Sequence, residues 1–522
     1  MTGFIKKRWV LFLVLIIFII CKIPHLSYPY YWDESWPYMP AIREMYKHGV
    51  SLMPYAVDPG LSHCHPLFFH AVAATWMHIF GTSHIAMHSF PLFISILLLI
   101  AIYEAGLRLF NERVAIMALI LVATQVAFFV QSSFVLFEVL VAFLAFLSLY
   151  FYVKNKYLLT ATFLTALFYT KESGLVAGFV LGIDALAGIF NKNVEWKTRL
   201  YRLMSILVPC VLIAIYFIIQ KQERGWYISP FYMARFERRS SAVWYNFRRN
   251  SLRNSFWEYL KYWYYILLLV LSILAAIKNK SVKYLVFFLP AIVIYGIVDD
   301  QRSRILPGAP FFALFVFSIV FLFYILHSLK VYANTRQGKF VVLSGIFIAC
   351  FFCFTSLNFF TYRYLMAALI PLCFFTAVVY DKLMERSYPV LFYPVLVLIL
   401  AIGFLSFKND GKTGDVDPGA FDAMDVQQDE VNYFEQNKLY GSAIGCGGVL
   451  EYEHLSDPAT GFLHTDKGFE KISFNIDTNT DFVLFDNLEQ DARYNQVKNG
   501  TAFCLVHRYE KGRVWDEIYK RK

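Results

Sequence analysis

Two adjacent carboxylates, Asp33 and Glu34, are the first side chains that could do chemistry. They lie about ten residues beyond an apolar run, in the segment Tyr28-Pro29-Tyr30-Tyr31-Trp32-Asp33-Glu34. A carboxylate can act as the base that removes a proton from an acceptor hydroxyl or amine. The neighbouring aromatic rings can stack on a sugar and exclude water. Two adjacent acids are also common in solvated loops, so this pair alone is a weak signal.

A second polar group follows in the same segment, which reads Ser62-His63-Cys64-His65-Pro66-Leu67. The two histidines and the cysteine between them could bind a metal ion. A closed metal site needs more ligands, and the spacing indicates none. A structural or acceptor-binding role of His63 and His65 is therefore favoured over metal binding.

Further ionisable residues stand at the ends of apolar runs. A charge at a helix end costs little, so each of these residues alone can simply mark such an end, whereas a charge inside the bilayer is costly and tends to be functional. Carboxylates combined with cations suit transfer from an anionic donor, because basic groups neutralise a leaving phosphate as its charge develops. The candidates are Glu138, Lys171, Glu172, Asp299, Asp300, Arg302, Arg304, Tyr362 and Arg363.

The composition indicates that membrane helices position these groups. Of the 522 residues, 58% are hydrophobic and only 16% are charged, whereas soluble domains carry roughly 25% charged residues. A soluble protein, a disordered chain and a disulfide scaffold are therefore excluded. A spanning helix needs about 20 apolar residues. We predict an α-helical polytopic membrane protein with about 13 spans, at 9–21, 88–109, 114–131, 134–153, 158–170, 174–190, 203–219, 263–277, 284–298, 306–327, 340–357, 364–380 and 388–407.

The distribution of basic residues predicts the orientation of these spans. Cytoplasmic loops are enriched in Lys and Arg, which here points to topology rather than to nucleic-acid binding. The basic loops all fall on the cytoplasmic side only if the apolar run 66–80 does not cross the membrane. We therefore expect 66–80 to be a juxtamembrane or re-entrant helix within a first outer loop, 24–87. The N-terminus is then cytoplasmic, and the C-terminus and all the candidate residues share the outer side.

One loop breaks the positive-inside pattern. Residues 221–261 hold nine Lys and Arg against three Glu, yet the topology places them outside. Three explanations are open for this loop. The predicted topology is wrong here, the cations rest on lipid headgroups, or the cations bind an anionic substrate at the outer surface. Its aromatic residues suit a position in the membrane interface.

The last part of the chain differs sharply in charge. Residues 408–522 hold 13 basic and 21 acidic side chains, whereas residues 1–407 hold 35 and 17. This part of the sequence contains a polar linker, an expected helix at 426–437 and several strand-like runs. The pattern predicts a small extracytoplasmic α/β domain over 408–522. Gly445-Cys446-Gly447-Gly448 is interpreted as a tight turn rather than a phosphate loop. Cys446 and Cys504 could pair in an oxidising compartment.

Four short motifs resemble those of the GT-C glycosyltransferases, and more narrowly the group of protein O-mannosyltransferases and aminoarabinose (lipid A) transferases. They are Asp33-Glu34 after the first span, His65-Pro66-Leu67, Thr170-Lys171-Glu172 and Arg363-Tyr364-Leu365. The resemblance covers roughly residues 1–407. The family usually has His-Pro-Pro at the second motif and often Arg-Tyr-Leu-Leu-Pro at the last. Arg304-Ile305-Leu306-Pro307 is a second candidate for that last motif.

The resemblance implies a GT-C-like transmembrane catalytic domain, in a bacterial plasma membrane, that uses a polyprenyl-phosphate-linked sugar. Asp33 would be the acceptor-binding base, and Glu34 would assist or orient it. The donor phosphate would be held by Lys171, Arg363 and Arg302 or Arg304. Substrate-binding roles are expected for Glu138, Glu172, His63, His65 and Tyr362.

The expected step is a single in-line displacement with inversion of the anomeric carbon, which needs one base and a stabilised leaving group. It requires no cofactor, and a divalent metal is not predicted. The expected partners are the lipid-linked donor, membrane lipids, and a protein, lipid A or other surface glycan as acceptor.

Two other functions fit the sequence less well than the transferase does. A transporter or flippase of lipid-linked saccharides would predict internal repeats and ionisable groups near mid-membrane. The sequence has no obvious repeat, and its charges cluster at span ends. A non-catalytic scaffold would leave Asp33 and Lys171 without a role.

Overall fold

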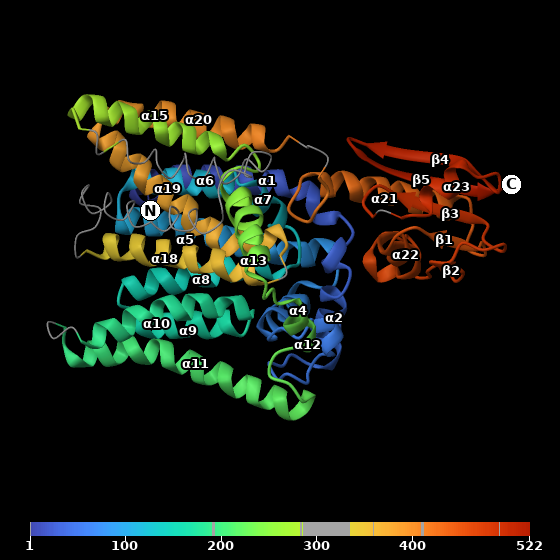
Figure 1. The fold of residues 1–522 in the computed structure, drawn as a ribbon, viewed down its shortest axis with the longest axis horizontal. Helices are drawn as coiled ribbons and strands as arrows, with labels where there is room; N and C mark the ends of the chain where they lie inside the picture. Colours follow the sequence, from blue (N-terminus) through green and yellow to red (C-terminus); the bar gives the residue numbers. More distant parts are fainter. Residues whose placement is uncertain are drawn as a thin grey trace.

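The computed structural model describes residues 2–190, 194–281, 284, 335–358, 360–408, 412–489 and 491–522. These residues form a long helical bundle and a smaller sheet-containing unit at one end of it (Figure 1). The predicted spans 284–298 and 306–327, with Asp299, Asp300, Arg302 and Arg304, lie outside the described residues. The predicted fold class, a helical membrane protein with a small C-terminal α/β part, is confirmed.

The bundle is built from apolar helices that lie roughly side by side (Figure 1). Eight helical stretches among the described residues are long and apolar enough to cross a membrane. The number of crossings, 13, stays a prediction. The bundle helices are α1 (Thr2–Lys22), α5 (His84–Leu109), α6 (Glu112–Ala123), α8 (Phe137–Val153), α9 (Tyr157–Phe168), α10 (Leu175–Ile189), α11 (Trp196–Arg224), α15 (Tyr262–Asn279), α18 (Arg336–Leu357), α19 (Met366–Arg386) and α20 (Phe392–Ser406), which follows the turn η8 (Pro389–Leu391).

The predicted span 114–131 is interrupted in the structure. Helix α6 ends at Ala123, and a short helix α7 (Val126–Gln131) follows. Gln125 has an extended backbone, with φ −72° and ψ 122°. Its side-chain amide donates to the carbonyl of Leu121 at 2.9 Å, which satisfies a carbonyl that the end of a helix leaves free. No Gly or Pro marks this break, so the sequence did not indicate it.

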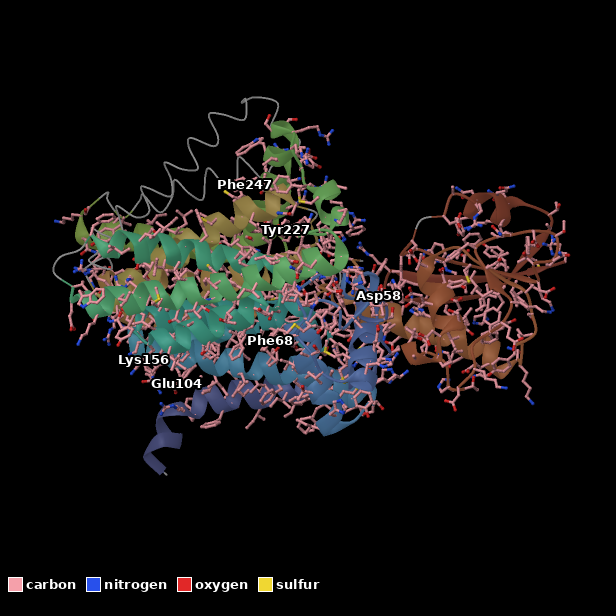
Figure 2. All side chains as sticks on the ribbon, turned by 90° about the horizontal axis from the view of Figure 1, so that it is seen from below. Asp58, Phe68, Glu104, Lys156, Tyr227 and Phe247 are labelled. Atoms are coloured by element: carbon pink, nitrogen blue, oxygen red, sulfur yellow. The ribbon has the colours of Figure 1, made fainter. Side chains whose placement is uncertain are left out.

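The end of the bundle remote from the C-terminal unit is joined by ion pairs between helices. Arg8 Nε lies 2.6 Å from Glu104 Oε1, and Arg113 Nε lies 2.9 Å from Asp381 Oδ1. Figure 2 shows Glu104 and Lys156 at this end and Asp58 at the opposite one. Basic residues of several predicted cytoplasmic loops thus share one end of the bundle.

The opposite end, next to the C-terminal unit, is capped by short helices and is called the site end below (Figure 1). Helix α4 packs there against α2 and α5. That 66–80 is a juxtamembrane helix stays a prediction. The short elements are η1 (Ile23–Ser27), η2 (Trp32–Glu34), α2 (Tyr38–His48), α3 (Pro59–Ser62), α4 (Phe68–Phe80), η3 (Glu172–Gly174), α12 (Pro230–Arg235), α13 (Ser240–Asn246), η4 (Phe247–Arg253), α14 (Asn254–Phe256) and η7 (Tyr362–Leu365).

The C-terminal unit is a five-stranded mixed sheet with helices. The strand order is β2-β1-β3-β5-β4, with β1 parallel to β2 and β3, and β5 antiparallel to β3 and β4. Its elements are α21 (Gly419–Gln436), β1 (Ile444–Cys446), α22 (Val449–Ser456), η9 (Pro458–Thr460), β2 (Ile472–Ser473), β3 (Phe482–Asp486), α23 (Tyr494–Asn499), β4 (Phe503–Lys511) and β5 (Val514–Arg521). The predicted helix begins seven residues earlier than expected, and α22 and α23 were not predicted.

The suggested disulfide between Cys446 and Cys504 does not form. Both cysteines are free, Cys446 buried and Cys504 exposed. Cys446 lies in β1 and Cys504 in β4, and strands β3 and β5 separate them. Neighbouring strands are about 4.8 Å apart, so the two thiols are too distant to bond.

Candidate active site

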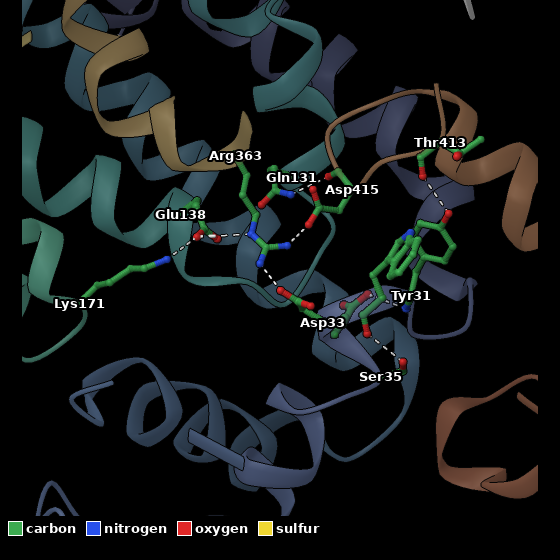
Figure 3. Close-up of polar contacts among 11 residues, drawn as sticks. Tyr31, Asp33, Ser35, Gln131, Glu138, Lys171, Arg363, Thr413 and Asp415 are labelled. Atoms are coloured by element: carbon green, nitrogen blue, oxygen red, sulfur yellow. Dashed lines mark hydrogen bonds and ion pairs between the residues drawn. The ribbon is translucent and has the colours of Figure 1, made fainter. Parts of the chain in front are cut away.

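A buried arginine organises the site end. Arg363 lies in η7, just before α19, and its side chain is 3% exposed. Its Nη2 pairs with Asp33 Oδ2, its Nη1 pairs with Asp415 Oδ2, and its Nε lies 3.6 Å from Glu138 Oε1 (Figure 3). Segments that are far apart in the sequence therefore meet at one guanidinium group.

Lys171 supplies the second cation of this cluster. Its Nζ donates to Glu138 Oε1 at 2.8 Å and lies 4.0 Å from the centre of the Tyr364 ring. Lys171 and Glu138 are 9% and 4% exposed. Glu138 stands in the first turn of α8, where the positive end of the helix dipole also favours a negative charge.

The cluster as a whole places three carboxylates around two cations. Buried ions are stable only when they are paired and hydrogen-bonded, and each of these five groups has such a partner. Asp33 is the most accessible of the carboxylates, with its side chain 35% exposed, against 12% for Asp415. Asp33 is therefore the carboxylate that an incoming molecule can reach.

Glu34 points away from Asp33 and is fully buried. Its Oε1 accepts from the backbone N–H of Val135 at 2.7 Å and lies 2.9 Å from His88 Nε2. Its Oε2 accepts from the backbone N–H of Tyr31 at 3.3 Å. Glu34 thus ties η2 to the loop before α8, and this contact fixes the backbone that carries Asp33.

The two predicted histidines have different surroundings. His65 is buried, with Nδ1 2.7 Å from Glu172 Oε2 and Nε2 3.0 Å from the hydroxyl of Tyr232. Both ring nitrogens of His65 are therefore engaged within the protein. His63 lies near the rings of Tyr38 and Phe231, and burial lowers its pKa to about 4. His63 is a neutral ring at neutral pH.

Tyr362 lies apart from the guanidinium cluster. Its hydroxyl contacts Lys261 Nζ and donates to the carbonyl of Asn254 at 3.2 Å. Its ring stacks on Tyr259 with 5.6 Å between the ring centres. These contacts give Tyr362 a supporting position between η7 and the segment before α15.

The basic loop 221–261 lies at the site end. Its α12 carries Tyr232 onto His65, and Arg224 donates to the carbonyl of Val57 at 3.1 Å. The backbone N–H of Glu237 donates to the carbonyl of Leu357 at the end of α18. The loop therefore shares one end of the bundle with Asp33, as the topology predicted. Figure 2 shows Tyr227 and Phe247 on this side of the bundle.

Sequence reasoning missed Asp415, Gln131 and Tyr232. The segment 412–417 was interpreted as a linker, but it lies against the cluster. Gln131 Nε2 donates to the carbonyl of Asp415 at 2.6 Å, and the hydroxyl of Tyr31 donates to the carbonyl of Thr413 at 2.8 Å (Figure 3). The available signal was Asp415-Val416-Asp417-Pro418, which places two acids within the short segment after the last span.

Comparison with known proteins gives matches among solved structures only. No family model and no curated protein matches the chain. The aminoarabinose transferase ArnT from Cupriavidus metallidurans, bound to undecaprenyl phosphate, is 11% identical and has a TM-score of 0.53, with 98% of each chain covered. The archaeal oligosaccharyltransferase AglB from Archaeoglobus fulgidus, in complex with an inhibitory peptide and a dolichol-phosphate, has a TM-score of 0.44 at 11% identity, over 92% of this chain and 69% of that one.

The likeness to ArnT extends over nearly the whole chain, including the C-terminal unit. At 11% identity, this likeness shows only that the two chains share an arrangement of helices and strands. The chemistry has to be inferred from the residues of the site. The chain therefore shares its overall fold with ArnT.

Proposed function

We propose that the protein is a glycosyltransferase that moves a sugar from a polyprenyl-phosphate carrier to an extracytoplasmic acceptor. The observation that carries the proposal is the Arg363 cluster, in which a buried guanidinium and Lys171 lie beside one accessible carboxylate, Asp33. Guanidinium groups bind phosphate oxygens through paired hydrogen bonds. The acceptor is a protein, lipid A or another surface glycan.

In this mechanism Asp33 removes a proton from the acceptor while the acceptor atom attacks the anomeric carbon. The bond between that carbon and the phosphate oxygen breaks, and the configuration inverts. Arg363 and Lys171 stabilise the negative charge that develops on the leaving phosphate. Asp415 pairs with Nη1 of Arg363. We infer that the donor phosphate displaces Asp415, and that Arg363 then loosens its hold on Asp33.

The supporting residues fall into two groups. Glu138 holds Lys171 and Arg363 together, and Glu34 fixes the backbone of η2. His65, Glu172 and Tyr232 form a connected set at the side of the cluster, where we place the acceptor or the sugar.

We propose that the site end faces away from the cytoplasm. The remote end carries Arg108, Lys154, Lys278 and Arg386 near its helix ends, and cytoplasmic loops are enriched in such residues. Cys504 is exposed on β4. A membrane-impermeant maleimide should label Cys504 in intact cells, and Cys504→Ser, which keeps the other free cysteines, is the control that should lose this labelling. Labelling only after permeabilisation would reverse the orientation.

The test uses purified protein in lipid with a panel of polyprenyl-phosphate sugars and envelope extract as acceptor. Release of polyprenyl phosphate is followed for the wild type, for Asp33→Asn and for Asp466→Asn, an exposed aspartate of the C-terminal unit. Acceptor-dependent release that only Asp33→Asn abolishes supports the transferase and identifies the sugar. Folded protein that releases nothing from any donor contradicts it and favours a transporter. The anomeric configuration of the product, read by NMR, tests inversion.

A further inference from the structure

A second cluster of acidic side chains lies inside the C-terminal unit, outside the candidate active site. Asp486 ends β3 and Asp516 lies on β5, and the two are direct partners across the antiparallel pair. Glu430 comes from α21 and Glu451 from α22. The residue exposures are 0% for Asp516, 2% for Glu451, 3% for Glu430 and 7% for Asp486. Glu489, in the loop after β3, is half-buried.

Six carboxylate oxygens of this cluster are buried without a hydrogen-bond partner. Both oxygens of Glu451 and of Asp516 are buried without a partner, as are Asp486 Oδ2 and Glu430 Oε1. Asp486 Oδ1, by contrast, accepts from the backbone N–H groups of Leu488 and Glu489 at 3.0 and 2.8 Å. Within the described part of the chain, no Lys, Arg or His forms an ion pair with any of the five carboxylates.

Such an arrangement is unfavourable unless a cation or bound protons neutralise it. Burying an unpaired carboxylate costs several kcal/mol, and like charges directly opposite each other on neighbouring strands are destabilising. A polar atom that is buried without a partner also loses its hydration without compensation. The structure holds four such side chains together from four different elements, which indicates a bound cation rather than a chance cluster.

The geometry fits one hard cation. One oxygen each from Glu451, Asp486 and Glu489 lie within 4.8 Å of one another. Ca²⁺ binds oxygens at about 2.3–2.6 Å, so two ligands of one ion are at most about 5 Å apart. All the available ligands are oxygens, which select Ca²⁺, Mg²⁺ or Mn²⁺ over softer metals. Mg²⁺ usually keeps several of its waters, whereas several carboxylates converge here.

Gly448 makes the approach of these carboxylates possible. A Cβ atom at this position would lie 2.3 Å from Glu489 Oε2 and 2.5 Å from Glu451 Oε2. The backbone N–H of Leu450 also donates to Glu489 Oε2 at 2.9 Å. The turn Gly447-Gly448 and the start of α22 therefore shape the space in which the two acids meet.

We propose that Glu451, Asp486 and Glu489 bind a Ca²⁺ ion that joins α22 to the end of β3. Asp516 adds negative charge beside Asp486, and Glu430 contacts Asp516. The ion is structural, and its binding does not depend on the proposed transferase activity. It stands close to the active-site loop, because Glu453 on α22 lies 2.9 Å from the hydroxyl of Ser35. The bound ion therefore stiffens the helix on which the Asp33 loop rests.

The experiment measures Ca²⁺ binding to the full-length protein in detergent after treatment with EDTA. Isothermal titration should give one site per chain, and Ca²⁺ should raise the apparent Tm. Glu451→Gln combined with Asp486→Asn should weaken binding at least tenfold and abolish the Tm increase. Asp466→Asn combined with Glu470→Gln, exposed in the same unit, should bind as the wild type does.

Comparing the Tm values of the metal-free proteins shows whether the substitutions only remove Ca²⁺ ligands or also destabilise the fold. The Glu451→Gln, Asp486→Asn variant removes like charges, so its metal-free Tm should equal or exceed that of the metal-free wild type. A lower metal-free Tm would mean that these carboxylates are held by protons or hydrogen bonds, and would overturn the proposal. Absence of Ca²⁺ binding at millimolar concentration would also overturn it, as would binding that survives both substitutions. Tighter binding of Mg²⁺ or Mn²⁺ would overturn the assignment to calcium.

Discussion

Arg363 and Asp33 stand 330 positions apart in the chain and form an ion pair at the site end of the bundle. The pair joins the short helix before α19 to the loop after α1, and the remaining N–H groups of Arg363 face Asp415 and Glu138. One planar group therefore sets the relative position of three carboxylates.

Arg363→Lys should lower the rate of polyprenyl-phosphate release by about 10²–10³-fold, the range for the loss of one preorganised charge-stabilising donor. An ammonium group is a point charge and cannot present the guanidinium fork to several oxygens. Release kinetics with a saturating donor measure the effect. Arg386→Lys, which is exposed at the remote end, is the matched control. Equal rates for the two variants would remove Arg363 from the chemistry.

Substitutions of the two adjacent carboxylates should differ in effect, with Asp33 affecting turnover and Glu34 affecting thermal stability. Asp33→Asn should lower turnover by about 10²–10⁴-fold, as loss of a general base does, with little change in apparent Tm. Glu34→Ala should instead lower the apparent Tm, because the N–H of Val135 loses its acceptor at about 1–3 kcal/mol. Thermal unfolding in detergent and turnover are measured on the same samples. If turnover survives in Asp33→Asn, Asp33 is not the base.

Substitutions of Lys171 and Glu138 should have coupled, non-additive effects on the stability of the folded protein. Lys171→Met leaves Glu138 paired with Arg363 alone, whose Nε lies 3.6 Å from Glu138 Oε1, and breaking a buried pair costs about 3–5 kcal/mol. The double variant Lys171→Met, Glu138→Gln should recover part of that loss, because the unpaired charge is gone. A double-mutant cycle on apparent Tm checks this coupling. Strictly additive losses would show that the two side chains act independently.

Asp415→Asn should bind polyprenyl phosphate more tightly than the wild type, by a factor of several. The neutral amide competes less well for Nη1 of Arg363, so the phosphate displaces it more easily. Binding is measured by titrating the lipid into protein in micelles, with Asp466→Asn as control. Weaker binding would instead make Asp415 a residue that positions Arg363.

His63 should make the protein sensitive to acid. Burial lowers the pKa of His63 to about 4 in the folded protein, against about 6.5 in an unfolded chain. The unfolded state therefore binds more protons between these values, and stability falls as the pH drops from about 6.5 to about 4. The groups that influence His63 are His65, Asp33, Arg363 and Lys171. His63→Gln should show a smaller loss of apparent Tm over this range, and an unchanged loss would exclude His63 as a source.

The grouping of candidate residues at one end followed from the order of spans and basic loops, which hydropathy specifies. The contacts within the group depend on packing between distant segments. Glu34 looks like Asp33 in the sequence, yet only the fold turns one toward Val135 and the other toward Arg363. The family motif left two candidate arginines. Arg363 pairs with Asp33 in the structure, and Arg304 lies outside the described residues.

Other features had no local signal. The break at Gln125 contains no Gly or Pro, and a side-chain hydrogen bond to the carbonyl of Leu121 accompanies it. Asp415 follows a span and precedes Pro418, a pattern that predicts a linker wherever it occurs. The pairing of Asp486 with Asp516 is set by strand register, which short strand-like runs do not determine.

The segment 412–418 has a consequence for dissecting the protein. It joins the bundle to the C-terminal unit, and it also supplies Asp415 to the guanidinium of Arg363. A chain truncated after residue 407 would therefore lose Asp415, an ion-pair partner of Arg363, together with the whole C-terminal unit. An inactive truncation would say nothing about the sheet itself. Truncation after Pro418 keeps Asp415, and the difference between the two shortened chains separates the contribution of one aspartate from that of the unit.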